Sequence, residues 1–203
     1  MFNVGLRMSG IGKHRSAAPA GAQYAAAAGT VLSLTISVGD TVIVFTQSNN
    51  SPSSGTDDGV GGSNTYTHLT GYQWAGYGDA WYCDSAAHVA ATVTMNGSGA
   101  PYQNICGASI PTAIGHGANG ATGASNTISI TTTANGSKVL GCIQQAVGGG
   151  WTVNHGTEVA RSVYTDSGQC ILLETDVPSS GTSTQSQATG GSFNNALAVE
   201  VKM

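Results

Sequence analysis

The run of residues 64–95 constrains the fold most, because it reads as consecutive strands and holds two of the three Trp and four of the seven Tyr residues. Three stretches in it alternate in polarity or are rich in aromatic and β-branched residues, namely 65–70, 77–83 and 89–95. Successive side chains of a strand point to opposite faces, so Val89, Val93 and Met95 share one face. The run therefore predicts a half-buried sheet that anchors the core.

The rest of the chain repeats this pattern of short extended runs between Gly- and Asn-rich turns. Further strands are predicted at residues 30–37, 41–47, 102–110, 126–132, 138–147, 151–155, 158–164, 169–175, 183–188 and 193–201. Asn135 and Gly136 mark the clearest hairpin. No long amphipathic helix and no internal repeat is apparent, while 48–63 and 111–125 read as long polar loops. We expect an all-β fold, an antiparallel β-sandwich of jelly-roll character with an extended N-terminal arm.

The predicted domain boundary follows the composition, with residues 1–29 as the arm and 30–203 as the β-sandwich domain. The arm is Gly-rich and basic, then Ala-rich, and 23–28 is expected to make at most a short helical turn. Its basic residues are predicted to contact an acidic neighbouring subunit, with a solubilising terminus as the next interpretation and packaged nucleic acid as a weaker one. These residues are Arg7, Lys13, His14 and Arg15.

Charge excludes several function classes. Only 8% of the residues are charged, against roughly 25% in a typical soluble domain, so Ser, Thr, Asn, Gln and Gly must form the surface. The net charge of −4 argues against nucleic acid as a general partner, because phosphate binding needs clustered cations.

No segment is long and apolar enough to span a membrane, and none reads as a signal peptide. Synthesis in the cytoplasm is expected.

The four cysteines are expected to be free and buried rather than paired or bound to metal. They lie on different predicted strands without the close spacing of a metal motif, at Cys83, Cys106, Cys142 and Cys170. Cytoplasmic thiols stay reduced, and cysteine is often buried as a small apolar residue. A zinc site from His68, His116 and His155 with Cys106 would need long-range convergence and is not favoured. No cofactor is expected.

Two acidic pairs are candidate sites. Asp57 and Asp58 lie in a Gly-rich loop and could offer carboxylate oxygens to Ca²⁺, but they lack the full calcium-loop spacing, so a solvated loop is the preferred interpretation. Asp79, Asp84 and His88 resemble an acid and base group near the aromatic cluster. No nucleophile motif surrounds a serine, so structural roles at strand ends are favoured and no catalytic residue is predicted.

Three aromatic residues near a turn form the other candidate surface. Tyr72, Trp74 and Tyr77 surround Gly71 and Gly76. Exposed aromatic side chains stack on sugar rings or anchor protein interfaces. Packing at the sandwich edge is the preferred interpretation, followed by a protein interface and then by glycan contact.

The order of sequence motifs resembles the β-sandwich domains of tailed-bacteriophage virion proteins, of the capsid decoration and tail-fibre types, and of related bacterial surface proteins. The resemblance covers about residues 30–203. It rests on SVGDTVIVF, NTYTHLTGY, DAWYCDSAAHVAATVTM, TTTANGSKVLGCIQQ and the closing NNALAVEVKM. The polar insertions at 48–63 and 111–125 and the arm depart from the pattern of that group.

The resemblance implies a non-enzymatic structural protein of a bacteriophage virion, assembled in the cytoplasm of the bacterial host. A capsid decoration protein that binds the major capsid protein or other virion subunits is expected, as a homo-oligomer with the arm clamping neighbours. The alternative is a receptor-binding module of a tail or fibre that recognises a host-surface glycan. Neither interpretation involves a membrane or nucleic acid.

Overall fold

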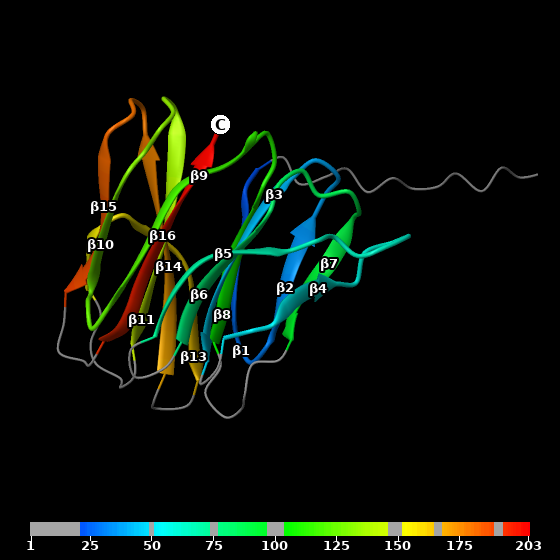
Figure 1. Cartoon of the computed structure of the whole chain (residues 1–203), viewed down its shortest axis with the longest axis horizontal. Coiled ribbons are helices and arrows are strands. Elements are labelled where there is room, and N and C mark those ends of the chain that lie inside the picture. The colour runs from blue at the N-terminus through cyan, green and yellow to red at the C-terminus, as the bar shows by residue number, and fades with distance from the viewer. Residues whose placement is uncertain are drawn as a thin grey trace, which may run out of the picture.

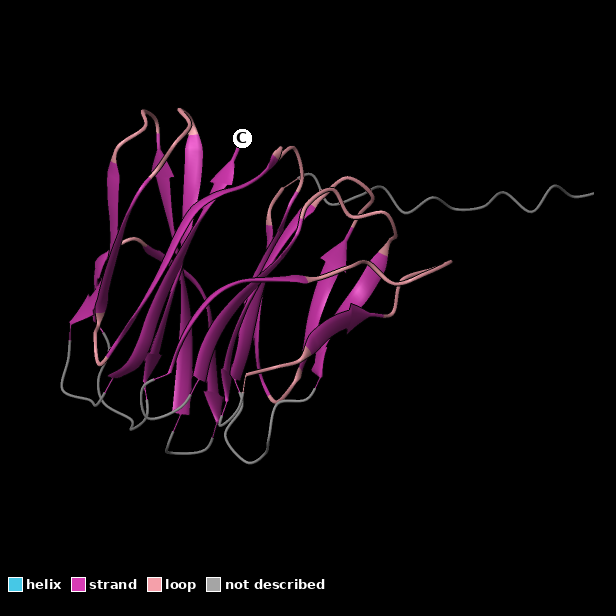
Figure 2. Ribbon diagram, in the orientation of Figure 1, coloured by secondary structure: helices cyan, strands magenta, loops and turns pink. Residues whose placement is uncertain are grey.

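The computed structural model describes residues 21–48, 51–73, 77–96, 104–145, 152–164, 168–188 and 193–203. Every regular element in these ranges is a β-strand, and all strand pairs among them are antiparallel (Figures 1 and 2). The predicted all-β class is confirmed. Among these residues there is no helix with the length and apolar character that a membrane crossing requires.

The strands divide into two sets of eight along the chain. The first set is β1 (Gln23–Ala28), β2 (Val31–Ile36), β3 (Thr41–Ser48), β4 (Ser54–Asp57), β5 (Thr67–Gln73), β6 (Tyr77–Cys83), β7 (Ala90–Asn96) and β8 (Asn104–Ile110). The second set is β9 (Gly115–Gly123), β10 (Thr127–Thr131), β11 (Ser137–Gln145), β12 (Thr152–His155), β13 (Thr157–Tyr164), β14 (Gly168–Val177), β15 (Thr182–Ala188) and β16 (Phe193–Lys202).

Four sheets stack as layers (Figure 1). The N sheet has the order β1-β8-β3-β6-β5, and the C sheet has the order β13-β14-β11-β16-β9. These two five-stranded sheets face each other across a central core. A three-stranded sheet, the N cover (β2-β7-β4), packs on the outer face of the N sheet, and the C cover (β10-β15-β12) packs on the outer face of the C sheet.

The inner strands are apolar on both faces because each face meets another sheet. In β3, Val42 and Val44 pack toward the N cover while Ile43 and Phe45 enter the central core. Side chains alternate between the two faces of a strand, so a strand between two covered faces needs apolar residues at consecutive positions. The same reasoning explains the nearly continuous apolar runs of β8, β11 and β16.

The second half of the chain repeats the sheet order of the first. Replacing β1 to β8 by β9 to β16, one for one, converts the N sheet into the C sheet and the N cover into the C cover. The β-bulge also recurs at the equivalent place, at His68/Thr70 between β5 and β6 and at Glu158/Ala160 between β13 and β14. The sequence-based expectation that there is no internal repeat is therefore wrong.

Equivalent buried polar pairs occur in the two halves. Asn104 Nδ2 donates to Gln47 Oε1 at 3.2 Å between β8 and β3, and Asn195 Nδ2 donates to Gln144 Oε1 at 3.3 Å between β16 and β11. Each Asn lies directly opposite its Gln in the strand register. The two halves therefore share a side-chain contact as well as a topology.

A second pair recurs with its members exchanged. Ser109 Oγ on β8 donates to Asp40 Oδ2 at 2.6 Å, while Ser137 Oγ on β11 donates to Glu200 Oε1 on β16 at 2.8 Å. The acid precedes β3 in the first half but lies on β16, the equivalent of β8, in the second. A hydroxyl and a carboxylate therefore satisfy each other at the same place although no sequence motif is shared.

Two sequence-based expectations about local structure are wrong. Residues 23–28 form β1 and pair with β8, so the sheet begins before residue 30 and no helical turn forms. Alanine favours helices, but Ala25 and Ala27 pack on one core and Tyr24 and Ala26 on the other, and this burial decides the conformation. The remaining arm, with Arg7, Lys13, His14 and Arg15, lies outside the described residues.

The two predicted loops also contain strands. β4 lies within 48–63 and pairs with β7, and β9 lies within 111–125 and pairs with β16. Both strands are short of β-branched and aromatic residues, as GHGANGATG in β9 shows. Their pairing comes from a neighbouring strand rather than from local propensity.

Candidate functional site

A set of turns at one end of the sandwich is held together by backbone hydrogen bonds. Gly39 N donates to Ala86 O at 2.8 Å, and Ala86 N donates to Asp40 O at 2.8 Å, which joins the β2–β3 turn to the segment between β6 and β7. Val60 N donates to Val89 O at 3.0 Å and attaches the loop after β4 to the same segment. These turns therefore form one connected surface.

The chain terminus extends this surface. Ile114 N donates to Lys202 O at 2.8 Å, next to the C-terminal residue. His116 N donates to Asp84 Oδ1 at 3.0 Å, so the start of β9 is tied to the segment that begins the β6–β7 connection. In Figure 1 the C-terminus lies at the end of the molecule where these connections meet.

Five of the six exposed large apolar side chains in the described part belong to this surface, which we call the apolar end. They are Val38, Val60, Val89, Ile114 and Met203, with exposed fractions between 39% and 80%. The sixth, Val31, lies on β2. Scattered exposed apolar residues are normal, whereas a contiguous exposed apolar patch is typical of interaction surfaces. Val60, which lies between glycines in a polar loop, is the one local sequence signal for this surface.

Buried carboxylates fix the turns at this end. Asp40 Oδ2 accepts hydrogen bonds from Ser37 N at 2.9 Å and from Ser109 Oγ, which closes the β2–β3 turn. In the second half Glu200 is fully buried and accepts from Ala118 N, Thr133 N, Ala134 N and Ser137 Oγ, at 2.8 to 3.0 Å. Burial alone would raise the pKa of Glu200, but these donors outweigh it and lower the pKa to about 2.

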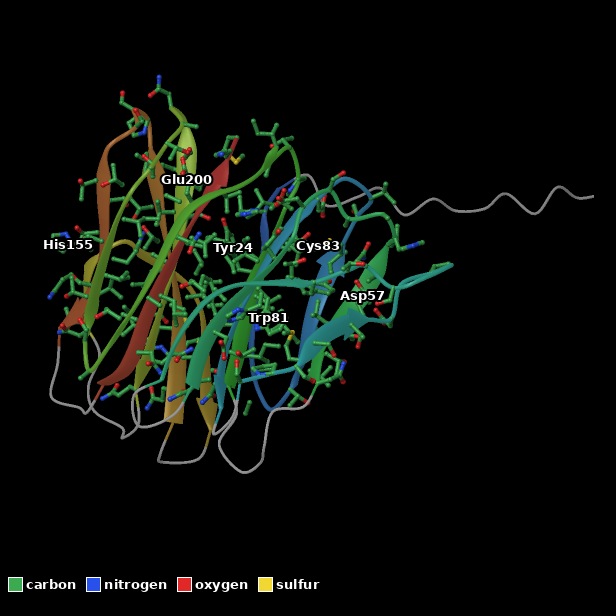
Figure 3. All side chains as sticks on the ribbon, viewed as in Figure 1. Tyr24, Asp57, Trp81, Cys83, His155 and Glu200 are labelled. Atoms are coloured by element: carbon green, nitrogen blue, oxygen red, sulfur yellow. The ribbon has the colours of Figure 1, made fainter. Side chains whose placement is uncertain are left out.

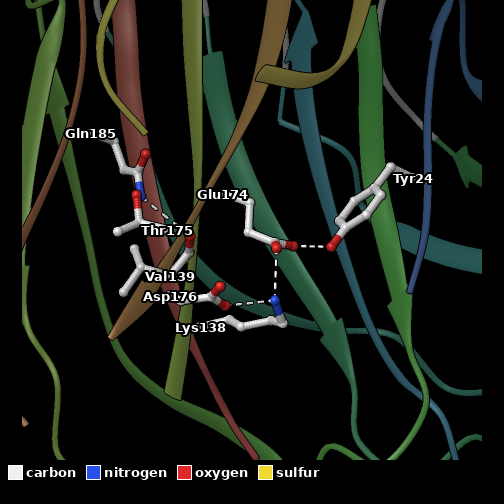
Figure 4. A network of polar contacts seen from close by, with 7 residues as sticks. All are labelled: Tyr24, Lys138, Val139, Glu174, Thr175, Asp176 and Gln185. Atoms are coloured by element: carbon white, nitrogen blue, oxygen red, sulfur yellow. Dashed lines mark hydrogen bonds and ion pairs between the residues drawn. The ribbon is translucent and has the colours of Figure 1, made fainter. Parts of the chain in front are cut away.

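A polar cluster occupies the edge of the central core, where β1 meets the C sheet (Figure 4). Lys138 Nζ lies 2.7 Å from Glu174 Oε1 and 2.7 Å from Asp176 Oδ1, and the Tyr24 hydroxyl donates to Glu174 Oε2. Burial, with a smaller effect of Asp176, raises the pKa of Glu174. The cluster joins the two halves of the chain through β1 and β14.

Two adjacent hollows border this cluster. One of about 420 Å³ is lined by His155, Gly156, Thr175, Asp176, Val177, Pro178, Thr182, Ser183 and Thr184. The other, of about 350 Å³, is lined by Gly156, Thr157, Val159, Glu174, Thr175 and Asp176. They share Gly156, Thr175 and Asp176. Their linings combine hydroxyls with carboxylates and include no Phe, Tyr or Trp side chain.

Asp57, the first of the two less favoured calcium candidates, has protein donors on both of its oxygens. Oδ1 accepts from Gly59 N and Asn64 N, each at 3.1 Å, and Oδ2 accepts from Asn64 Nδ2 at 2.7 Å and from the Tyr66 hydroxyl at 2.9 Å. The carboxylate thus organises the loop between β4 and β5. Figure 3 shows Asp57 on the N-cover side of the molecule.

Asp58, the second calcium candidate, ties the same loop to β7. Its Oδ1 accepts from Ala91 N and Thr92 N, each at 2.8 Å, and these backbone donors lower the pKa of Asp58. Both acids serve as loop anchors, and the less favoured calcium interpretation has no geometric counterpart among the described residues.

The residues weighed as an acid and base group, for which structural roles were favoured, have separate partners. His68 Nε2 lies 2.8 Å from Asp79 Oδ1, and His116 Nδ1 lies 2.7 Å from Asp84 Oδ2. His88 packs against the loop that contains Gly62. Asp79 and Asp84 therefore do not converge on one histidine.

The unfavoured zinc grouping is likewise not assembled. His155 lies on β12, at the opposite end of the long axis from Asp57 (Figure 3), and His68 is engaged by Asp79. Of the candidate aromatic residues, Trp74 lies outside the described residues. Tyr72 and Tyr77 are placed on β5 and β6, flanking the hairpin connection, and their side chains also lie outside the described part.

All four cysteines are free and buried, as predicted. What the sequence did not indicate is that Cys106, Cys142 and Cys170 meet in the central core, with Sγ–Sγ distances of 2.7 Å, 2.8 Å and 3.5 Å. They come from β8, β11 and β14, so no local spacing could have revealed them. Cys83 lies apart, in the core between the N sheet and its cover.

No protein-family model, curated protein sequence or solved structure matches the chain.

Proposed function

We propose that the chain is a non-enzymatic structural protein of a bacteriophage particle, which decorates the capsid exterior and binds neighbouring virion subunits. The apolar end is the observation that carries this proposal. Its five apolar side chains project from turns that hydrogen bonds hold together, so little conformational entropy is lost when a partner covers them. The sequence resemblance supplies the class of partner.

The repeated topology supports the finer fold within the proposal. We propose that each set of eight strands is a jelly-roll unit, because eight strands in two facing sheets are typical of that architecture, which is common in viral capsid proteins. In each half the first, eighth, third, sixth and fifth strands share one sheet, and the second, seventh and fourth share the other.

The engagement of the acidic side chains supports a non-enzymatic role. Glu200 and Asp57 accept several protein donors each, and Asp79 and Asp84 pair with different histidines. A catalytic site requires titratable groups that converge on one reacting position. The carboxylates of Glu200, Asp57, Asp79 and Asp84 are held in separate structural contacts instead.

Cryo-electron microscopy of purified virions tests the proposal. We expect density for this chain at regular capsid lattice points, with the apolar end against another subunit. A variant that combines V38S, V89S and I114S should retain the melting temperature but lose at least tenfold in affinity for particles, because it removes apolar contact area. V31S is the matched control, since Val31 is also exposed but lies outside the apolar end.

Two outcomes would overturn the proposal. The first is that mass spectrometry of purified particles detects no copies of the chain. The second is that the triple variant binds particles as tightly as V31S does. Density at the tail tip instead of the capsid would transfer the role to the tail or fibre.

The two hollows beside Asp176 favour a second candidate, a glycan-binding module of a tail or fibre. Threonine and serine hydroxyls with an exposed carboxylate offer hydrogen bonds to sugar hydroxyls. A glycan array with the whole protein would test it. D176A should abolish any binding, whereas E158Q, which alters an acid outside both hollows, should not.

A further inference from the structure

We propose that Cys106, Cys142 and Cys170 form a binding site for a single soft metal ion with three sulfur ligands, of which Cu(I) is the representative. The site is independent of the proposed virion role, because it lies in the interior and uses none of the residues of the apolar end. It is the one group of three or more potential metal-ligating side chains that the described residues bring together.

The sulfur geometry brings the three ligands to one point. Cys106 Sγ lies 2.7 Å from Cys170 Sγ and 3.5 Å from Cys142 Sγ, and the latter two are 2.8 Å apart. Three thiolates that bind one ion in a trigonal plane at a metal–sulfur distance of about 2.3 Å lie roughly 4 Å apart, so the three sulfur atoms must move outward when the ion binds. The three sulfur atoms converge on one position between the two sheets, where a single ion could bind.

The surroundings select the class of ion. All three cysteines are fully buried, and their neighbours in the central core include Leu140 and Leu172. No further His, Cys, Asp or Glu of the described residues joins the group. Structural zinc takes four ligands, and Ca²⁺ and Mg²⁺ require oxygen. Thiolate ligands select soft ions, and a three-sulfur set without a fourth protein ligand fits Cu(I).

The internal repeat shows that packing alone does not require thiols here. The strand register equates Cys142 with Phe45, and Cys106 with Leu197. It also equates Cys170 with Gly78, because Cys170 lies opposite Gln144 and Gly78 lies opposite the equivalent residue, Gln47. The equivalent place in the central core is thus filled by Phe45 and Leu197 without sulfur. Three cysteines converge at only one of two equivalent places within the described part.

Burial determines how the ion enters. The cysteines come from β8 of the N sheet and from β11 and β14 of the C sheet, so the site is completed only when the two sheets pack together. A bound ion would therefore link the two halves, and it must bind during folding or during a local opening. Metal-dependent stability follows, since a ligand that binds only the folded state stabilises it.

Refolding the full chain under anaerobic, reducing conditions with and without Cu(I) tests the inference. We expect about one equivalent of copper per chain, a higher melting temperature, and an X-ray absorption spectrum with sulfur ligands alone at about 2.3 Å. Parallel refolding with Zn²⁺ should give weaker retention through dialysis. C142A should lose the copper, whereas C83A, which removes a buried cysteine outside the cluster, should retain it.

Clear results would contradict the site. If C142A and C83A retain equal amounts of copper per chain, the ion binds elsewhere. An absorption spectrum with nitrogen or oxygen ligands would lead to the same conclusion. A wild-type chain that refolds without retaining copper would leave the three thiols as core residues only. If C142A does not fold, the absorption spectrum of the wild-type protein decides the ligand set without any variant.

Discussion

At the scale of single residues, buried carboxylates organise the turns of this protein. Glu200 has no exposed surface, yet it carries a charge that five backbone and hydroxyl donors surround. A buried charge is tolerated only when its hydrogen bonds are made. The Gly117 position is also constrained, because a Cβ there would lie 2.2 Å from Glu200 Oε2.

Replacing Glu200 by Gln should destabilise the protein by about 3 kcal/mol at pH 7, because the amide cannot accept all of the donors that the carboxylate accepts. The measurement is urea unfolding of E200Q beside E158Q, an exposed-acid control. A loss in E200Q no larger than in E158Q would show that the carboxylate does not hold the turn.

The same group predicts a pH dependence. The folded pKa of Glu200 is lowered from 4.5 to about 2, so its stabilisation is fully present above about pH 4.5 and is lost as the pH falls toward 2. Wild-type stability should fall across this window more steeply than that of E200Q. Parallel curves for the two proteins would contradict the assignment.

At the scale of elements, strand pairs determine the structure more than local propensity does. β1 is an alanine-rich segment with helix propensity, and β9 is rich in glycine, yet both complete a five-stranded sheet. Each adds an edge to a sheet whose inner strands are strongly apolar. The sheet therefore recruits segments that would not form strands alone.

Truncation separates the arm from β1. Deleting residues 1–20 should leave the free energy of unfolding unchanged, whereas deleting 1–28 should lower it by about 3 kcal/mol or more, because Tyr24 and three packed alanines are lost with the strand. Chemical unfolding of both truncations gives the comparison. Equal stability of the two would show that β1 does not belong to the folded sheet. Particle binding by the variant that lacks only residues 1–20 then tests the contribution of the arm alone.

The recurrent Gln–Asn pairs give a matched prediction. N104A and N195A each leave a buried Gln without its partner across the strand pair. We expect each substitution to cost about 1–3 kcal/mol, with similar values because the sites are equivalent in the repeat. Thermal unfolding of the two variants measures the costs. A large loss in one variant and none in the other would show that the two contacts are not energetically equivalent.

At the scale of the whole molecule, two similar eight-stranded halves pack face to face. β1 contacts β13 and its equivalent β9 contacts β5, while β8 contacts β14 and its equivalent β16 contacts β6. Each contact between the two halves therefore occurs twice, the second time with the halves swapped. This is the relation between the two subunits of a two-fold symmetric dimer. The central core therefore resembles a dimer interface within one chain.

Each half alone should expose the central face and self-associate. Residues 21–114 and 115–203, expressed separately, are expected to be oligomeric or insoluble, because an apolar sheet face is left in water. Co-expressed, they should form a one-to-one complex, which size-exclusion chromatography with light scattering measures. Two stable monomeric halves that do not bind each other would contradict a shared core.

Part of this structure could be predicted locally. Alternating polarity indicated most of the strands, because this signal depends on neighbouring residues. The hairpin predicted at Asn135 and Gly136 is wrong, because β10 pairs with β15 while β11 pairs with β14 and β16, so this turn joins two different sheets. β4 and β9 were missed because their pairing partners, not their own residues, make them strands. Of the candidate sites, Asp57 and Asp58 were identified as residues, but their roles as loop anchors depend on donors from other segments.

The sequence by itself determined the all-β class and the burial of the four cysteines, since alternation and apolar content act through local geometry and transfer from water. The tertiary structure decided the repeat, the convergence of three of the cysteines and the grouping of exposed apolar residues at one end. Each of these depends on which distant strands and turns meet. That choice follows from the packing of whole sheets, and the order of residues along a single strand does not reveal it.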